Sequence, residues 1–497
     1  MHKRIQFNYT VNQSQINIKQ LQELKFKYKM KQFFKLTGAI ILLSQIINQA
    51  SAQELTFKAQ GIWSGQLELP TSKLEIIFKI SEDENGILIS KMDVPLQGAK
   101  DLTVSKTEIK NDSLFLEVAM IMGSFKGAFE TDKKINGIWK QGGAKLPLVL
   151  EKTDKITKLN RPQTPQKPFP YIEKEVEYLN PKSGYKLAGT LTIPEDAKEC
   201  PAVILITGSG AQDRDETIFE HKPFMVIADY LTKNGIAVLR VDDRGVGGSE
   251  GKISDATSSD FADDVLAGVN FIKTIDGIDF KKIGLIGHSE GGLIAPIVAI
   301  KSDDIAFIVL LAGPGITGEQ ILYQQAELLS KTAGLTDDQI KQNRKLQEAL
   351  FNILLTEKDS LKQIDRLQRT YSGGMYPMLS TDQKKLIDAK VAGINNTWFK
   401  FFLTYNPYQT LTKVSCPVLA LNGEKDLQVP PKSNLEAINN ALTEGGNKNF
   451  KTMELKNLNH LFQNCKTGAV AEYAEIEETI SPETLAIIKD WILKVVQ

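Results

Sequence analysis

Cysteine and histidine are scarce in this chain of 497 residues, which contains three of the first and four of the second. A small exported fold stapled by disulfides needs more cysteines than this, so we expect no disulfide framework. No cluster of cysteine and histidine has the spacing of metal ligands, so we expect no metal site. The scarcity of histidine also helps the search for a catalytic base, because few candidates exist.

Net charge is lacking too, since 60 basic residues balance 60 acidic ones. Eight of the basic residues and one of the acidic residues lie in residues 1–52, which leaves 52 basic and 59 acidic residues for the rest. Phosphate binding requires a basic face, so this balance argues against nucleic acid as a partner. The glycine-rich pairs Gly208/Gly210 and Gly245/Gly247 complete no nucleotide-binding motif, and we expect no cofactor.

The chain opens without an apolar run long enough to cross a membrane. Residues 36–43 are apolar but too short for this, follow Lys31 and Lys35, and precede Ala-Ser-Ala at 50–52. This order is typical of a signal peptide, so residues 1–52 predict export to the periplasm or the outside of the cell. Met30 is a natural start for the segment, with residues 1–29 then either upstream of the true start or a long basic region. No cysteine of a lipid anchor follows, so we expect no stable membrane anchor.

Short alternating strands are predicted for residues 53–150, punctuated by turn residues at the spacing of a β-sandwich or barrel. Trp63 and Trp139 both occur in G-x-W sequences that bracket the region, and we expect them in the core of a small all-β domain. This domain could shape substrate access or bind a partner. Residues 151–170 end in a proline-rich stretch and are predicted to be a stiff linker.

Strands and helices alternate through residues 171–497, which predicts a mostly parallel sheet with helices on both faces. One interval breaks the alternation. Residues 317–411 contain two runs of helical spacing, at 320–331 and 337–355, and a dense aromatic cluster at 398–402. We expect a helical cap that covers a substrate pocket, because such pockets are mostly apolar.

One short motif in this region has a clear chemical meaning. The sequence GHSEGG at 287–292 follows the apolar run 283–286 and precedes a helix-like run at 293–300. Strand, G-x-S-x-G and helix in this order predict a nucleophile elbow, a turn so tight that small residues must flank the serine. Ser289 is therefore the candidate nucleophile.

A serine hydroxyl is a weak nucleophile and needs a base, which is found here by elimination. In a chain with this elbow, the acid and then the histidine follow the serine. His2 lies in the predicted signal segment, His221 precedes Ser289, and we expect the side chain of His288 to diverge from its neighbour in the elbow. His460, just after a strand-like run at 451–455, is the remaining candidate.

The acid that orients the histidine should lie in a loop after the preceding strand. Residues 417–421 are such a strand, and Asp426 is our candidate in the loop that follows, with Glu424 as the alternative. The 34 residues from Asp426 to His460 suit one helix and one strand. The 137 residues from Ser289 to Asp426 are too many for plain alternation, which again indicates an insertion.

The tetrahedral intermediate of acyl transfer needs two N–H donors at its oxyanion. The backbone N–H of Glu290, the residue after the nucleophile, is the first candidate. The second should come from the loop TGSG at 207–210, which follows the strand at 203–206. Ser209 is our choice, with Gly208 or Gly210 as alternatives.

Three segments together resemble a bacterial esterase group of the α/β-hydrolase family: TGSGAQDRDE at 207–216, DDRGVGGS at 242–249 and GHSEGG at 287–292. The resemblance covers residues 170–497 well and the β region more loosely, and members of the group often carry a small β-rich domain in front. It implies an α/β-hydrolase fold and a serine carboxylesterase with Ser289, Asp426 and His460 as its triad. No triad position departs from the pattern.

The resemblance extends to serine aminopeptidases and dienelactone hydrolases, so the substrate does not follow from it. Two alternatives to an esterase of small-molecule substrates stay open. One is an exopeptidase on the same machinery, which needs an acidic anchor for a free amino terminus, with Glu290 as the suggestive residue. The other is a binding protein that acts through its β domain. Neither the natural substrate nor the oligomeric state follows from the sequence.

Overall fold

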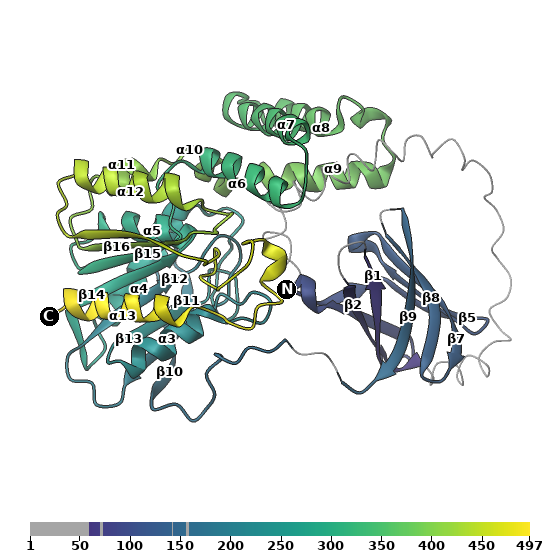
Figure 1. The fold of residues 1–497 in the computed structure, drawn as a ribbon, viewed down its shortest axis with the longest axis horizontal. Helices are drawn as coiled ribbons and strands as arrows, with labels where there is room; N and C mark the ends of the chain where they lie inside the picture. Colours follow the sequence, from purple (N-terminus) through teal and green to yellow (C-terminus); the bar gives the residue numbers. More distant parts are fainter. Residues whose placement is uncertain (1–58, 70–72, 142, 156–158) are drawn as a thin grey trace. The chain divides into compact units, whose positions relative to one another are not determined.

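The computed structural model describes residues 59–69, 73–141, 143–155 and 159–497, and the predicted signal segment at 1–52 lies outside them. Backbone contacts divide the described chain into two compact units, with the boundary between Asn160 and Arg161. The first unit is built of strands, and the second contains both strands and helices (Figure 1).

Nine antiparallel strands build the described part of the first unit, in the spatial order β4-β3-β2-β1-β9-β8-β7-β6-β5. The sheet curls back on itself: Thr107 of β5, the last strand of this order, donates a hydrogen bond of 2.9 Å to Ser90 of β3, the second strand. The bounds are β1 (Gly61–Glu68), β2 (Lys73–Glu82), β3 (Leu88–Val94), β4 (Ala99–Val104), β5 (Lys106–Lys110), β6 (Ser113–Val118), β7 (Gly123–Thr131), β8 (Lys134–Gln141) and β9 (Ala144–Thr153).

The inward side of this sheet holds the two tryptophans that bracket the region in the sequence. Trp63 and Trp139 are fully buried beside Phe78 and Phe125. The Trp63 indole N–H donates to the backbone oxygen of Ala59 at 2.7 Å, so its polar atom is satisfied. The expectation that both tryptophans are core residues is confirmed.

An eight-stranded sheet forms the centre of the second unit, in the order β10-β11-β13-β12-β14-β15-β16-β17. The strands β10 and β11 pair antiparallel, β11 also pairs antiparallel with β13, and the remaining pairs are parallel. The bounds are β10 (Tyr171–Leu179), β11 (Lys186–Pro194), β12 (Cys200–Ile206), β13 (Ala237–Val241), β14 (Ile278–His288), β15 (Phe307–Leu311), β16 (Val418–Gly423) and β17 (Phe450–Leu455).

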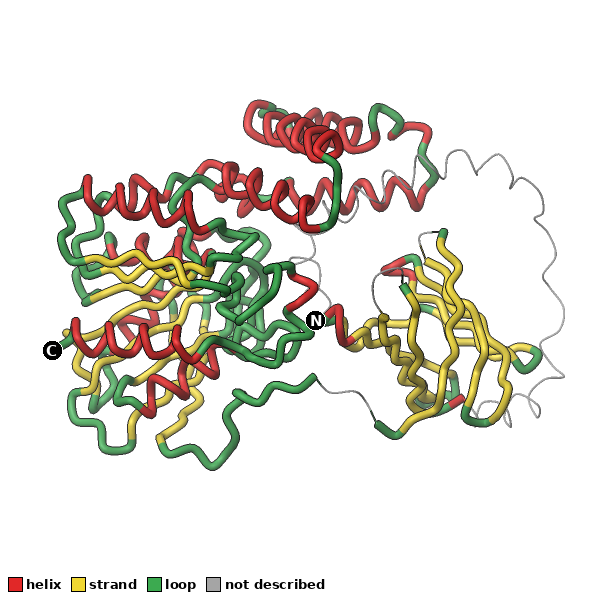
Figure 2. Tube along the Cα trace, viewed as in Figure 1, coloured by secondary structure: helices red, strands yellow, loops and turns green. Residues whose placement is uncertain are grey.

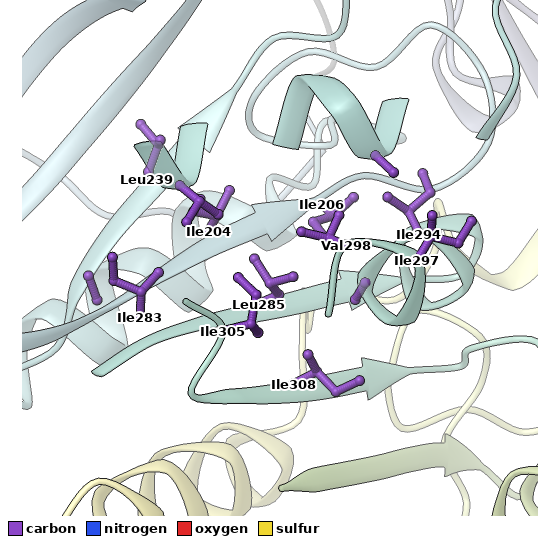
Figure 3. Packing of buried hydrophobic residues seen from close by; sticks show 14 of the residues in the cluster. Ile204, Ile206, Leu239, Ile283, Leu285, Ile294, Ile297, Val298, Ile305 and Ile308 are labelled. Atoms are coloured by element: carbon purple, nitrogen blue, oxygen red, sulfur yellow. The ribbon is translucent and has the colours of Figure 1, made fainter. Parts of the chain in front are cut away.

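Helices cover both faces of this sheet because alternate residues of each strand point to opposite sides. Ile204 and Ile206 pack on the side of α4 (Ser258–Ile272), α5 (Glu290–Ala299) and α12 (Pro431–Glu444). Val203 and Leu205 pack on the side of α3 (Pro223–Lys233) and α13 (Pro482–Val495). Figure 3 shows the first of these cores, where side chains of α5 lie against those of the parallel strands. The predicted fold class is confirmed.

A helical insertion separates β15 from β16 and occupies the interval that broke the alternation (Figure 2). Its own apolar core includes Phe351, Leu367, Trp398 and Leu403. None of the helices in the described ranges combines the length and apolar character needed to cross a bilayer. The helices of the insertion are α6 (Gly318–Thr332), α7 (Asp337–Thr356), α8 (Ser360–Ser372), α9 (Thr381–Ile394), α10 (Thr397–Thr404) and α11 (Pro407–Leu411).

The proline-rich stretch predicted as a linker differs from a free spacer in its second half. The half-buried guanidinium of Arg161 donates hydrogen bonds to the backbone oxygens of Phe219, Ala474 and Ile476. The side chain of Gln163 donates to the backbone oxygen of Ile480 at 2.8 Å. Polar side chains therefore attach the segment from Arg161 onward to the second unit, a contact that proline content alone does not reveal.

Candidate active site

Ser289 occupies the turn between β14 and α5, in a backbone conformation that residues other than glycine rarely adopt. Its φ is 53° and its ψ is −116°. Its N–H donates to the backbone oxygen of Leu311 at 2.8 Å, and its own backbone oxygen accepts from the N–H of Gly292 at 2.9 Å. Ser289 is partly exposed, whereas His288 and Glu290 on either side are buried. A strained turn that exposes only the serine is the geometry of a nucleophile elbow.

The two glycines of G-x-S-x-G are required by close approach of the backbone. A Cβ on Gly287 would lie 2.0 Å from the backbone oxygen of Gly291, and a Cβ on Gly291 would lie 2.1 Å from that of Ile206. Both separations are far below van der Waals contact. The strand, the elbow and the helix could not pack this tightly with larger residues at either position.

His460 and Asp426 lie together although 34 residues separate them. His460 lies in the loop after β17, and Asp426 lies in the loop after β16. Nδ1 of His460 is 2.8 Å from Oδ2 of Asp426, and both side chains are almost fully buried. The other carboxylate oxygen of Asp426 accepts from the backbone N–H groups of Gln428 and Val429, so the acceptor is held rigidly.

The alternative acid, Glu424, takes a different position. It is exposed, and its carboxylate accepts from the backbone N–H of Asn457 at 2.9 Å. The histidine loop itself is shaped by Asn459, whose side-chain oxygen accepts from the N–H groups of Leu461 and Gln463. The structure therefore pairs His460 with Asp426 and uses Glu424 to tie two loops together.

The loop after β12 lies against the elbow. A Cβ on Gly208 would approach the Cβ of Ser289 to 3.3 Å, which places this loop beside the candidate nucleophile. The N–H of Gly208 donates to Oε1 of Glu216 at 2.6 Å. That donor is already in use, so Gly208 is less suited to an oxyanion than Ser209, the next residue of the loop.

Glu290 is a candidate oxyanion donor through its backbone N–H, whereas its buried side chain accepts hydrogen bonds from other parts of the protein. Its Oε1 accepts from the hydroxyl of Ser258 at 2.6 Å and from the indole N–H of Trp398 at 2.7 Å. Burial raises the pKa of Glu290 above its usual range, although these two hydrogen bonds lower it. Burial also raises the pKa of Asp243 well above its usual value, against a hydrogen bond from Thr207.

A cavity of about 50 Å³ lies beside these two carboxyl groups. Its lining includes residues of α4 and the two neighbours of the candidate nucleophile, Gly208 and Glu290, but not Ser289 itself. Across the described residues, no three His, Cys, Asp or Glu side chains gather as a metal-binding set. The residues that line the cavity include Thr207, Gly208, Asp243, Phe261 and Glu290.

The loop at 242–249 has a structural role. Nε of Arg244 donates to Asp264 of α4 at 2.7 Å, and the side chain of Arg214 donates to Asp242 at 2.8 Å. The backbone N–H of Gly248 also donates to Asp242. These charges pair with one another inside the protein, so the loop contributes rigidity near the site.

A second buried pair of a histidine and a carboxylate, His288 with Glu216, lies next to the first and is not predicted from the sequence. Nδ1 of His288 lies 2.9 Å from Oε1 of Glu216, and the rings of His288 and His460 lie 4.8 Å apart. The divergence of neighbouring side chains in an elbow gives no reason to expect His288 at the site, and its partner Glu216 lies 72 residues away. The one signal in the sequence that points to Glu216 is its place at the end of the segment 207–216, which carries the family resemblance.

Residues 201–458, about half of the chain, match the family described as alpha/beta hydrolase fold. The chain belongs to the alpha/beta hydrolase fold family. Among curated relatives, esterase EstD of Thermotoga maritima is 27% identical over 292 residues, which are 57% of this chain and 62% of the esterase. The match thus spans less than two thirds of that relative's length.

Two solved structures align with the chain at lower identity. An esterase of Pyrococcus furiosus is 16% identical with a TM-score of 0.41, covering 69% of this chain and 100% of its own. The Est1E protein of Butyrivibrio proteoclasticus, solved with ferulic acid bound, is 20% identical with a TM-score of 0.37, covering 65% of this chain and 99% of its own.

Proposed function

We propose that this protein is a serine esterase that hydrolyses carboxylic ester bonds of small-molecule substrates. Ser289 is the nucleophile, His460 the base and Asp426 the acid that orients the base. The observation that carries the proposal is the buried 2.8 Å contact between Nδ1 of His460 and Oδ2 of Asp426. This contact holds the imidazole in the tautomer that leaves Nε2 to accept a proton.

The reaction proceeds in two halves through an acyl-enzyme. His460 takes the hydroxyl proton at Nε2 while Oγ of Ser289 attacks the ester carbonyl. The tetrahedral intermediate collapses, the bond to the alcohol breaks, and the alcohol leaves with the proton from His460. His460 then deprotonates a water that attacks the acyl group, and the proton returns to Oγ of Ser289 as the carboxylic acid departs.

The N–H groups of Ser209 and Glu290 stabilise the oxyanion in this scheme. Glu290 is the first residue of α5, and the first N–H groups of a helix have no partner within it. Ser209 follows Gly208, whose own N–H donates to Glu216. A preset pair of donors can lower the barrier by about 3 to 4 kcal/mol for each donor.

The likeness to an esterase of Thermotoga maritima supports the reaction class. The contacts of Glu290 argue against the exopeptidase alternative, because Ser258 and Trp398 already donate to its buried carboxylate. Glu290 is also 3% exposed, so a substrate ammonium group would have to enter a buried position to reach it. The close pairing of His460 and Asp426 argues in the same way against a protein that only binds.

The test is turnover of p-nitrophenyl esters of increasing acyl length beside a panel of aminoacyl anilides. Replacing Ser289→Ala should lower kcat for esters by about a million-fold. Ser302→Ala, a change at a partly buried serine remote from the elbow, is the control. Anilide turnover without ester turnover would contradict the proposal, and so would ester turnover that survives in the Ser289→Ala protein.

We further propose that the chain is exported, on the basis of the signal-like order within residues 1–52. Cell fractionation with antibody detection should find the protein outside the cytoplasm and shortened near Ala52. A full-length protein in the cytoplasmic fraction would contradict this part of the proposal.

A further inference from the structure

His288 is the residue before the proposed nucleophile, and its ring lies in a buried position between two loops. It is the last residue of β14, and its ring is tilted by 47° against that of His460 at 4.8 Å between centroids. Both of its nitrogens have partners. Nδ1 is 2.9 Å from Oε1 of Glu216, and Nε2 is 3.0 Å from the backbone oxygen of His460.

These partners define the protons on the ring. A backbone carbonyl can only accept, so Nε2 of His288 must carry a proton and donate it to the oxygen of His460. Oε1 of Glu216 already accepts the N–H of Gly208 at 2.6 Å and accepts again from Nδ1. A ring that donates at both nitrogens is an imidazolium, and the carboxylate of Glu216 balances its charge.

The electrostatic surroundings of His288 also favour a proton on both ring nitrogens. Burial lowers the pKa of His288, but the charge and hydrogen bond of Glu216 and the carbonyl of His460 raise it more, so that its pKa lies above the usual value. Asp426, the acid of the proposed triad, adds a smaller raising effect on the pKa. A buried charge is tolerated only when it is paired and hydrogen-bonded, and both conditions hold here.

Three parts of the proposed machinery meet at this pair. Glu216 holds Gly208, which lies against the Cβ of Ser289. His288 holds the backbone of His460 and is joined covalently to Ser289. We propose that protonated His288 and Glu216 form a positioning pair that ties the loop at 207–210, which holds the proposed oxyanion donor Ser209, to the loop of His460. This inference rests on the proposed esterase function and assigns no proton transfer to His288.

His288 is a positioning residue and not a second base. Both of its ring nitrogens are occupied by acceptors, so it has no lone pair for the hydroxyl of Ser289. Its effect runs through the backbone of His460. Displacements of about 1 Å in such a support can cost about 100-fold in rate.

The first experiment reads the protons on the ring directly. In ¹⁵N spectra of the full chain labelled at histidine, both ring nitrogens of His288 should be protonated at neutral pH, with assignment from a His288→Phe protein. Glu216→Gln keeps an acceptor oxygen but removes the charge, so one nitrogen of His288 should lose its proton. Glu220→Gln, at an exposed carboxylate in the same connection between β12 and α3, should change neither nitrogen.

The second experiment measures turnover. Glu216→Gln and His288→Phe should each lower kcat for p-nitrophenyl esters by about 10- to 100-fold with little change in KM. The double variant should lose no more than the worse single variant, because the pair acts as a unit. Glu220→Gln should keep full activity. Thermal unfolding of every variant separates a positioning effect from loss of the fold.

The outcomes distinguish this inference from the proposed function. A neutral His288 in the unaltered protein, or full kcat in folded Glu216→Gln protein, would overturn the positioning pair while leaving the esterase intact. If the unaltered protein turns over no ester, the ring protons still report on the pair, and the rate of fluorophosphonate labelling at Ser289 replaces kcat. Labelling that is equally fast in Glu216→Gln and unaltered protein would then overturn it.

Discussion

The indole nitrogen of Trp398 donates a hydrogen bond of 2.7 Å to the carboxylate of Glu290, the residue that follows Ser289. Trp398 belongs to α10 in the helical insertion, and Glu290 begins α5 under the elbow. The ring of Trp398 also stacks on that of Phe402 at 5.3 Å. One buried contact therefore couples the insertion to the peptide N–H proposed to stabilise the oxyanion.

Replacing Trp398→Phe tests this coupling. The smaller ring can retain the stacking on Phe402 but removes one of the two donors to Glu290, and the loss of a hydrogen bond typically costs about 0.5 to 1.5 kcal/mol. We expect a lower thermal midpoint and a lower kcat/KM on p-nitrophenyl esters. Trp491→Phe, on α13 against Phe307, is the matched control and should leave kcat/KM unchanged. Full stability and turnover in Trp398→Phe protein would show that the hydrogen bond from Trp398 to Glu290 does not link the helical insertion to the active site.

Replacing Asp426→Asn tests the orientation of the base. The amide should keep the two backbone hydrogen bonds of Gln428 and Val429 at its oxygen and present its NH₂ group to His460. Nδ1 would then accept, and the proton would move to Nε2, where it blocks attack. We expect kcat to fall about 10⁴-fold with the fold intact. Glu424→Gln is the control, and a loss of equal size there would point to the wrong acid.

Replacing Gly291→Ala tests the packing of the elbow. The added Cβ would meet the backbone oxygen of Ile206 at 2.1 Å, so β12 and α5 must move apart. Overpacking of this kind typically costs about 1 to 3 kcal/mol, and the displaced elbow should also lose activity. Gly334→Ala measures backbone strain alone, because its Cβ meets nothing within 4 Å at a φ of 76°. Equal thermal midpoints and equal activities for the two variants would contradict the close approach.

Acid should destabilise the protein through His221, which is fully buried beside Thr479 and the backbone oxygen of Tyr473. Burial and the charge of Arg161 lower its pKa from 6.5 to about 4. The unfolded chain therefore binds more protons between these values, so this contribution to stability is complete above pH 6.5 and is lost as pH falls towards 4.

Urea unfolding across that pH range measures the effect. His221→Gln should be less stable at neutral pH, since it loses packed contacts, but its urea midpoint should fall less steeply with acid than that of the unaltered protein. Parallel pH profiles for the two proteins would show that His221 does not carry the acid sensitivity.

The sequence predicted the elbow well because its signals are local. An apolar strand, a glycine on each side of Ser289 and a helix-forming run lie within twenty residues, and the steric reasons for Gly287 and Gly291 act between near neighbours or adjacent strands. Spacing along the chain separates Asp426 from Glu424 less clearly. Both lie in one loop, and only the path of that loop turns Asp426 towards His460 and Glu424 towards Asn457.

Contacts between distant segments were not predictable in the same way. Glu216 with His288 and Glu290 with Trp398 join residues 72 and 108 positions apart. Arg161, in a stretch that composition describes as a spacer, is attached to the second unit by backbone oxygens. Every residue has a backbone oxygen, so the sequence does not indicate which of them will accept a hydrogen bond from a distant side chain.

The sequence by itself determined the order of strands and helices, the apolar faces that build the sheet, and the residue types that an elbow and a triad require. These follow from periodicity and from steric limits that act over a few residues. Only the tertiary structure decided which buried polar groups are partners. Hydrogen bonds reach about 3 Å, so they depend on where loops from different strands converge and not on the spacing of residues along the chain.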